Sequence, residues 1–205
     1  MSKSFLFYKI CSLLWIGLFF ITSYIIVGKY YVGTPQLLPK IWIDHAIPFT
    51  AWTFWIYTSY YYFLVLGCLL MPDKKSFQRL RNAFFAILFF HIGLFCICPT
   101  YIILPNIIGN DWSSALGRWI QSMDETTKCF PSLHVSVTFL VSFSVSYYFK
   151  KLLLLINIWA LAIAISTLTT GQHYFYDVVS GFTVALVAFV TFYYIIPKYW
   201  ENPHE

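Results

Sequence analysis

Six apolar segments dominate the sequence, and each is close to the ~20 residues that a helix needs to cross a bilayer. They cover residues 10–27, 49–70, 82–103, 131–149, 152–169 and 174–196. Only 10% of the 205 residues are charged, against about 25% in a typical soluble domain. The sequence therefore predicts an all-α polytopic membrane protein, with six transmembrane helices in one bundle and a single domain over residues 1–205.

The 13 Lys and Arg residues are unevenly distributed between the two ends of the predicted bundle. Nine fall on the side that holds both termini, the loop 72–81 and the turn at Lys150 and Lys151. The other side carries Lys29, Lys40, Arg118 and Lys128. Because loops rich in Lys and Arg stay in the cytoplasm, this bias predicts cytoplasmic termini in a plasma or inner membrane. We therefore interpret the net charge of +5 as reflecting the orientation of the loops in the membrane, and no nucleic-acid partner is expected.

Several loop features have a simple structural interpretation. Asp44 and His45 are expected to be ordinary loop residues near the membrane interface. The segment 72–81 is expected to be a basic cytoplasmic loop, and residues 111–120 a short amphipathic helix with its aromatic side chains toward lipid. His91, inside the third apolar segment, is expected to be hydrogen-bonded within the bundle. The five cysteines show neither a disulfide framework nor a Cys-x-x-Cys metal spacing.

Residues 131–134, with the sequence Pro-Ser-Leu-His, stand where a polar loop gives way to the fourth apolar segment. Pro131 suits the first turn of a helix, because its missing N–H would be unpaired there anyway. Ser132 and His134 are then expected beside backbone N–H groups that have no partner within the helix. Such a helix start attracts anions, and a hydroxyl with an imidazole there suits phosphate chemistry. The alternative is a membrane helix that begins with Pro and Ser and happens to carry a histidine.

His173 and Asp177 lie at the start of the sixth apolar segment. Four residues apart, they would share one face of a helix, and the carboxylate would fix the tautomer of the imidazole. The fourth and fifth segments form a hairpin about 28 Å deep, at 1.5 Å per residue, so the chain returns to the membrane face where it entered. His134 and His173 are therefore expected at one depth, beside two helix starts with partial positive charge. A purely structural His–Asp pair is the alternative, but burying one is costly, so the sequence favours a functional site.

These motifs resemble those of the type-2 phosphatidic acid phosphatase superfamily, which is related to the haloperoxidases. The superfamily's second motif, Pro-Ser-Gly-His, is similar to residues 131–134. Its third motif is Ser-Arg, five residues, His, three residues and Asp, and it has the spacing of Ser166, Thr167, His173 and Asp177. The resemblance implies one phosphatase-like domain of six membrane helices. The Lys and Arg bias, which places both termini in the cytoplasm, predicts that both motifs face the extracytoplasmic side.

The resemblance also implies a metal-independent phosphohistidine mechanism that uses no cofactor. His173 would attack phosphorus, and Asp177 would orient it. His134 would protonate the leaving oxygen, and Ser132 would hold a phosphate oxygen together with nearby backbone N–H groups. The implied partners are a lipid phosphate substrate and the surrounding membrane lipids.

The chain departs from the family motifs at several positions. Leu133 replaces the usual Gly, and Thr167 replaces the usual Arg. The first motif, Lys, six residues and Arg-Pro, is absent, because Leu104 precedes Pro105 and Ile97 occupies the Lys position. The Pro-Ser-Leu-His and Gln-His-Tyr forms look more like the branch that contains inositol phosphorylceramide synthase-like proteins.

Arg118 and Lys128 are the only basic residues in the loop before the second motif, and either could supply the missing phosphate contact. The leading function is a lipid phosphatase that hydrolyses a phosphate monoester or pyrophosphate. One alternative is a lipid phosphotransferase that moves a phosphate or phospho head group onto a lipid or sugar hydroxyl. Another, of a different class, is a membrane scaffold or transporter without catalytic activity.

Overall fold

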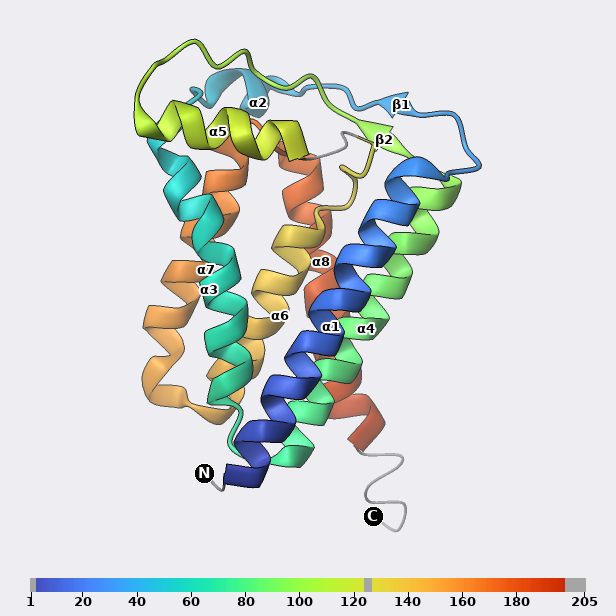
Figure 1. Ribbon diagram of the computed structural model, residues 1–205, viewed down its shortest axis with the longest axis vertical. Coiled ribbons are helices and arrows are strands. Elements are labelled where there is room, and N and C mark those ends of the chain that lie inside the picture. Colours follow the sequence, from blue (N-terminus) through green and yellow to red (C-terminus); the bar gives the residue numbers. More distant parts are fainter. Residues whose placement is uncertain (1–2, 124–126, 198–205) are drawn as a thin grey trace.

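Eight α-helices make up most of the computed structural model, which describes residues 3–123 and 127–197 (Figure 1). The helices long and apolar enough to cross a membrane are α1 (Lys3–Lys29), α3 (Phe54–Leu70, after a 3-10 turn at Ala51–Thr53), α4 (Lys74–Ile97), α7 (Leu153–Thr169, after a 3-10 turn at Lys150–Leu152) and α8 (Phe175–Val190, continued by a π-helical turn at Thr191–Ile195). A further apolar helix, α6 (Leu133–Tyr148), is shorter than the others. The all-α membrane fold is confirmed, with five full-length spans and one short apolar helix where six spans were expected.

Helix α6 is the central element of the bundle and packs against α3, α4, α7 and α8. Most of its residues are buried, including Ser136, Ser142 and Ser144. Their hydroxyls are satisfied inside the protein, since Ser144 donates to the carbonyl of Leu140 at 2.7 Å and Ser142 to Asn157 Oδ1 at 3.1 Å. These serines can therefore be buried at the centre of the bundle within an otherwise apolar helix.

Helix α4 begins about one turn after the second span ends, so the segment 72–81 is mostly helical and not a loop as expected. Asp73 caps this helix, because its Oδ1 accepts the N–H of Ser76 at 2.8 Å. The helix ends at Ile97, earlier than the expected residue 103. Pro99 explains this, because a proline disfavours the helical conformation of the residue before it.

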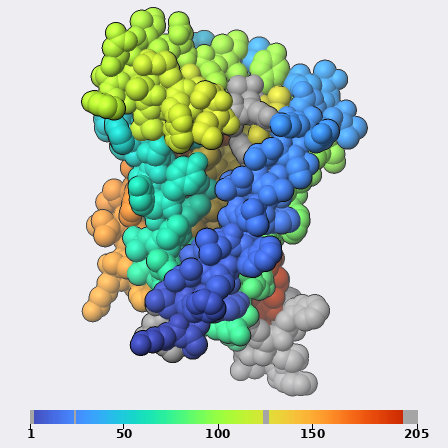
Figure 2. Space-filling model, in the orientation of Figure 1, coloured from blue at the N-terminus to red at the C-terminus, as the bar shows by residue number. Residues whose placement is uncertain are grey.

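The loops at one end of the bundle form a layer over the helix ends (Figures 1 and 2). This layer contains α2 (Trp42–Ala46), α5 (Trp112–Met123) and the two-residue parallel strands β1 (Gln36–Leu37) and β2 (Thr100–Tyr101). Helix α5 confirms the short helix expected at 111–120, and it lies across the top of the bundle in Figure 1. The described ends of the chain lie at the opposite end.

A three-segment clasp holds this loop layer together. Strand β1 pairs with β2, and Thr100 of β2 pairs in turn with Lys128. Thr100 also binds the two residues that follow Lys128. Its carbonyl accepts the N–H of Cys129 at 3.2 Å, and its Oγ1 accepts the N–H of Phe130 at 2.9 Å. The clasp therefore ties the loop before α2 to the segment that leads into α6.

The outer surface of the long helices is apolar. Trp15 of α1, Leu154 of α7 and Val187 of α8 are 72%, 71% and 60% exposed. Soluble proteins rarely expose continuous apolar surface of this kind, whereas a bilayer covers it. The surface therefore agrees with insertion in a membrane.

Candidate active site

The Pro-Ser-Leu-His motif lies at the buried start of α6. The helix begins at Leu133, with Ser132 as its N-cap, so Pro131 precedes the helix and does not occupy its first turn as expected. Ser132 Oγ accepts the N–H of Val135 at 3.3 Å, and an N-cap side chain of this kind satisfies one free N–H of the first turn. Because the oxygen accepts this bond, the hydroxyl proton of Ser132 is left to donate to a ligand.

His134 is held between two tyrosines of α3. Its ring centroid lies 4.8 Å from that of Tyr57 and 4.5 Å from that of Tyr60. Its Nε2 atom is buried and has no hydrogen-bond partner among the described residues. The ring centroids of His134 and His173 are 6.3 Å apart, which is close enough for both imidazoles to reach one phosphate group.

His173 and Asp177 form a hydrogen-bonded pair at the start of α8. His173 Nδ1 lies 3.3 Å from Asp177 Oδ2, and because a carboxylate can only accept, Nδ1 carries the proton and Nε2 has a free lone pair. The same Oδ2 accepts the N–H of Tyr174 at 2.9 Å. The helix therefore begins at Phe175, and His173 lies in the preceding turn, not on a shared helical face as expected. One carboxylate thus caps α8 and orients the histidine.

Two glycines allow the close approaches that assemble this site. Gly171 has φ of +66° in the turn after α7, where glycine is favoured, and a Cβ there would lie 2.8 Å from Pro105 Cδ. A Cβ on Gly181 of α8 would lie 2.5 Å from the carbonyl oxygen of Ser132. The starts of α6 and α8 therefore lie close together, and the N–H of Ser132 donates to the carbonyl of Asp177 at 3.0 Å.

Three buried polar atoms of the two motifs lack a hydrogen-bond partner among residues 3–123 and 127–197. They are His134 Nε2, Gln172 Nε2 and Asp177 Oδ1. Buried polar atoms are nearly always paired in folded proteins, so unpaired ones at a functional site indicate room for a polar ligand. Ser132 and Asp177 are both fully buried and His173 is 8% exposed, so the residues of both motifs are largely shielded from solvent.

The two basic residues predicted to bind phosphate lie elsewhere in the loop layer. Arg118 of α5 is exposed, and its Nη1 donates to the carbonyls of Ile107 and Gly109, at 3.2 and 2.5 Å. Lys128 is buried, and the adjacent Cys129 packs against Tyr174. The structure therefore brings Ser132, His134, His173 and Asp177 together, with the chain at Lys128 beside this group and the Arg118 guanidinium bound to its own loop.

Some residues near the site were missed by the sequence analysis. Asp44 was expected to be an ordinary loop residue, but its Oδ1 accepts the N–H of Phe175 at 2.7 Å. Lys40 and His173 line one pocket, and Tyr57 and Tyr60 hold His134. For Lys40 the sequence offered one signal of a possible role near the site. It is a basic residue on the side of the membrane where Lys and Arg are usually few.

His91, expected to be hydrogen-bonded within the bundle, is confirmed in that role. Its Nδ1 lies 2.8 Å from the carbonyl of Ile87, and its Nε2 lies 3.2 Å from Ser136 Oγ. The Ser136 hydroxyl also lies 2.9 Å from the carbonyl oxygen of Ser132 and 3.0 Å from that of Gly181. His91 thus supports the junction of α4, α6 and α8 from below the site.

The fold and the paired motifs define a membrane protein with a buried polar centre under the loops at one end of a helical bundle. A family model described as the PAP2 superfamily matches residues 29–191. The chain therefore belongs to the PAP2 superfamily, whose members are phosphatases and phosphotransferases, and this membership supports a phosphatase-type activity on a phosphate ester. No curated protein matches the sequence.

Proposed function

We propose that the protein hydrolyses a lipid phosphate, either a monoester or a pyrophosphate, through a phosphohistidine formed on His173. The hydrogen bond from His173 Nδ1 to Asp177 carries this proposal, because it leaves Nε2 as a free nucleophile beside the second histidine. The unpaired Nε2 atoms of His134 and Gln172 supply further support, because either nitrogen can donate a hydrogen bond to a phosphate oxygen. The apolar outer surface of the bundle supports a substrate that reaches the site from the membrane.

The reaction proceeds in two balanced steps. His173 Nε2 attacks phosphorus, the bond from phosphorus to the lipid oxygen breaks, and protonated His134 gives its proton to that oxygen. Water then attacks the phosphohistidine, His134 takes a proton from the water, and inorganic phosphate leaves His173. Asp177 stabilises the positive ring of the intermediate, as the carboxylate of a catalytic triad stabilises imidazolium.

Several groups are proposed to stabilise the charge on the transferring phosphoryl group. That charge is spread over three equatorial oxygens. Ser132 and backbone N–H groups at the start of α6 serve some of them, since helix starts favour anions. Lys128 and Arg118 remain predicted phosphate contacts, and the burial of Lys128 beside the chain that leads to Ser132 makes it the stronger candidate of the two.

We expect purified protein to release inorganic phosphate from a panel of lipid phosphates, with or without EDTA. Histidine is the nucleophile in this mechanism, and helix N-termini and basic side chains supply the electrostatic stabilisation. The panel should contain a phosphatidate, a sphingoid phosphate and an isoprenoid pyrophosphate, each in mixed micelles. Activity that is lost in EDTA and restored by Mg²⁺ or Zn²⁺ would contradict the mechanism.

The same panel, repeated with a lipid or sugar hydroxyl as acceptor, distinguishes hydrolysis from group transfer. Both reactions pass through the same intermediate, and the likeness of the Pro-Ser-Leu-His and Gln-His-Tyr forms to inositol phosphorylceramide synthase-like proteins favours testing transfer. A labelled phospho-acceptor product with little free phosphate would identify a phosphotransferase. No turnover with any donor would support the scaffold alternative.

We propose that the site faces the extracytoplasmic side of a plasma or inner membrane and that both termini are cytoplasmic. The support is the excess of Lys and Arg at the end of the bundle away from the site. We expect Ile108→Cys, in a variant without the five native cysteines, to react with an impermeant maleimide in intact cells, because Ile108 is 82% exposed in the loop layer. Labelling of Ile108→Cys only after lysis would reverse the orientation.

A further inference from the structure

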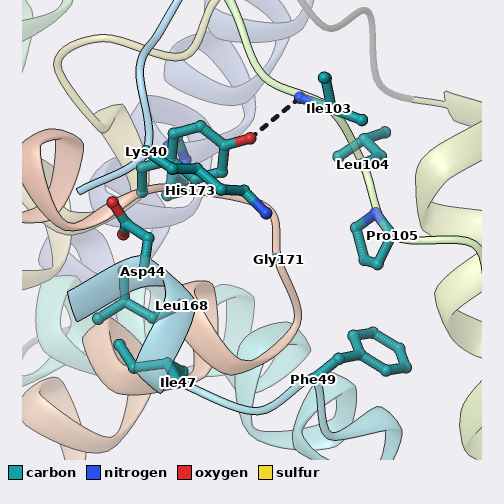
Figure 3. Close-up of a pocket in the computed structure, with 11 residues that line it drawn as sticks. Lys40, Asp44, Ile47, Phe49, Ile103, Leu104, Pro105, Leu168, Gly171 and His173 are labelled. Carbon is teal, nitrogen blue, oxygen red and sulfur yellow. Dashed lines mark hydrogen bonds between the residues drawn. The ribbon is translucent and has the colours of Figure 1, made fainter. Parts of the chain in front are cut away.

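A pocket of about 200 Å³ opens beside His173 in the loop layer (Figure 3). Its polar lining includes Lys40, Asp44 and His173. Figure 3 shows Lys40 and His173 at one end of the pocket and Ile47 and Phe49 at the other. The pocket therefore offers a cation and the proposed nucleophile at one end and an apolar wall at the other, as a lipid phosphate requires.

Lys40 rests on the residue that follows the nucleophile. Its Nζ lies 5.3 Å from the centroid of the Tyr174 ring, within the range of a cation–π interaction. Tyr174 is itself held in place, because its hydroxyl accepts the N–H of Ile103 at 3.3 Å. Burial raises the pKa of Tyr174, so the ring is a neutral support and not a counter-ion. Lys40 has a flexible stem with three donors, which allows the ammonium to move from the ring to an anion in the pocket.

Asp44 fixes the chain around Lys40 against the start of α8. Its Oδ2 accepts the N–H of Ile41 at 2.9 Å, and its Oδ1 accepts the N–H of Phe175 at 2.7 Å. Each carboxylate oxygen is therefore already bound to a backbone donor. These two bonds connect the residue after Lys40 to the residue two positions after His173, so the lysine and the nucleophile are positioned by one side chain.

We propose that Lys40 binds the phosphate of the substrate at His173, and that Asp44 positions Lys40 for this contact. The proposal rests on the proposed function. Lys40 would supply a cation from the loop before α2. This cation would compensate for the family's basic residues, which are replaced in this chain by Ile97, Leu104 and Thr167. Lys40 reaches the site only because the clasp of β1 with β2 and the bonds of Asp44 bring this loop to α8.

Lys40→Met is the direct test, with Lys40→Arg to restore the charge. Removing a hydrogen bond to a charged group predicts a fall in kcat/KM of about 10- to 100-fold and a matching rise in the inhibition constant of inorganic phosphate. The kcat/KM and the phosphate inhibition constant of Lys40→Arg should stay within about fivefold of the wild-type values, because the charge is retained. The matched control is Lys29→Met, because Lys29 is another exposed lysine at the same end of the bundle, and it should leave both constants unchanged.

A double-mutant cycle tests the positioning role of Asp44. Asp44→Ala should raise the inhibition constant of phosphate in the wild type but have little further effect in Lys40→Met, because coupled residues are not additive. A general structural defect would weaken phosphate binding equally in both backgrounds. Additive effects would therefore overturn the assignment of Asp44.

Binding of orthovanadate, measured by thermal unfolding, separates this proposal from the proposed function. We expect orthovanadate to stabilise the wild type and Lys29→Met but not Lys40→Met. A wild type that hydrolyses lipid phosphates, with Lys40→Met unchanged within twofold in kcat/KM and in phosphate inhibition, would overturn the role of Lys40 alone. A wild type without turnover, but with stabilisation by orthovanadate that depends on Lys40, would refute the proposed function and retain the anion site.

Discussion

Replacing His173 with alanine is expected to lower kcat by about 10⁴-fold or more, the scale seen when a member of a catalytic triad is disabled, and to leave the protein folded. The proposed nucleophile is lost, and His134 Nε2 has no hydrogen bond to Asp177 that could orient it as a substitute. The fold should survive because the backbone N–H of His173, which donates to the carbonyl of Thr167 at 3.1 Å, is present in alanine as well.

The measurement is phosphate release under saturating lipid phosphate, with thermal unfolding as the test of folding. A second readout is an acid-labile, alkali-stable phosphoenzyme, which should form in the wild type with labelled substrate and be absent in His173→Ala. The matched control is His45→Ala, since His45 is an exposed histidine of α2 in the same loop layer. Near-normal turnover in His173→Ala would exclude the phosphohistidine mechanism.

Asp177→Asn is expected to lower kcat by at least about 10²-fold, toward the ~10⁴-fold loss of the comparable substitution in a triad. The amide oxygen can still accept the N–H of Tyr174, so the cap of α8 and the fold are retained. The negative charge beside His173 is lost, however, and so is its stabilisation of the positively charged phosphohistidine. Activity should therefore fall much further than thermal stability.

Comparison with Asp177→Ala separates the two roles of this carboxylate. Alanine also leaves the buried N–H of Tyr174 without its acceptor, which costs about 1–3 kcal/mol, so Asp177→Ala should unfold at a lower temperature than Asp177→Asn. The control is Asp111→Asn, because Asp111 is an exposed carboxylate that caps α5 by accepting the N–H of Ser113 at 2.9 Å. Equal activity in Asp177→Asn and the wild type would leave Asp177 with a structural role only.

Several of the differences between the sequence prediction and the structure concern helix starts. The third span was expected to begin after the basic segment 72–81, because charged residues signal the end of an apolar run. Asp73 begins the helix earlier, and the charged residues occupy its first turns, where Arg81 Nη1 donates to the Tyr8 hydroxyl at 3.1 Å. Local hydrogen bonds of cap residues thus decide a boundary that hydropathy places several residues away.

The motif residues were predictable because their chemistry depends on short spacing and on the hairpin of two adjacent spans. The structure brings Ser132, His134, His173 and Asp177 together as expected. The local geometry differs from the expected one, because His173 lies in the turn before α8. Its hydrogen bond to Asp177 therefore does not require that the two residues share one face of a helix. A spacing of four residues is compatible with both geometries, so the sequence predicted the pair correctly from an incorrect local conformation.

The sequence by itself determined the apolar spans, the membrane fold and the two histidine motifs, because each is encoded by residues that are near one another along the chain. Only the tertiary structure decided which distant side chains complete the site. Asp44 bonds to the N–H of a residue 131 positions away, and the tyrosines of α3 reach His134 only because α3 packs on α6. Nothing in the local pattern around Lys40 or Asp44 specifies these contacts, since they depend on how the loop layer folds over the helix ends and on the clasp that holds it there.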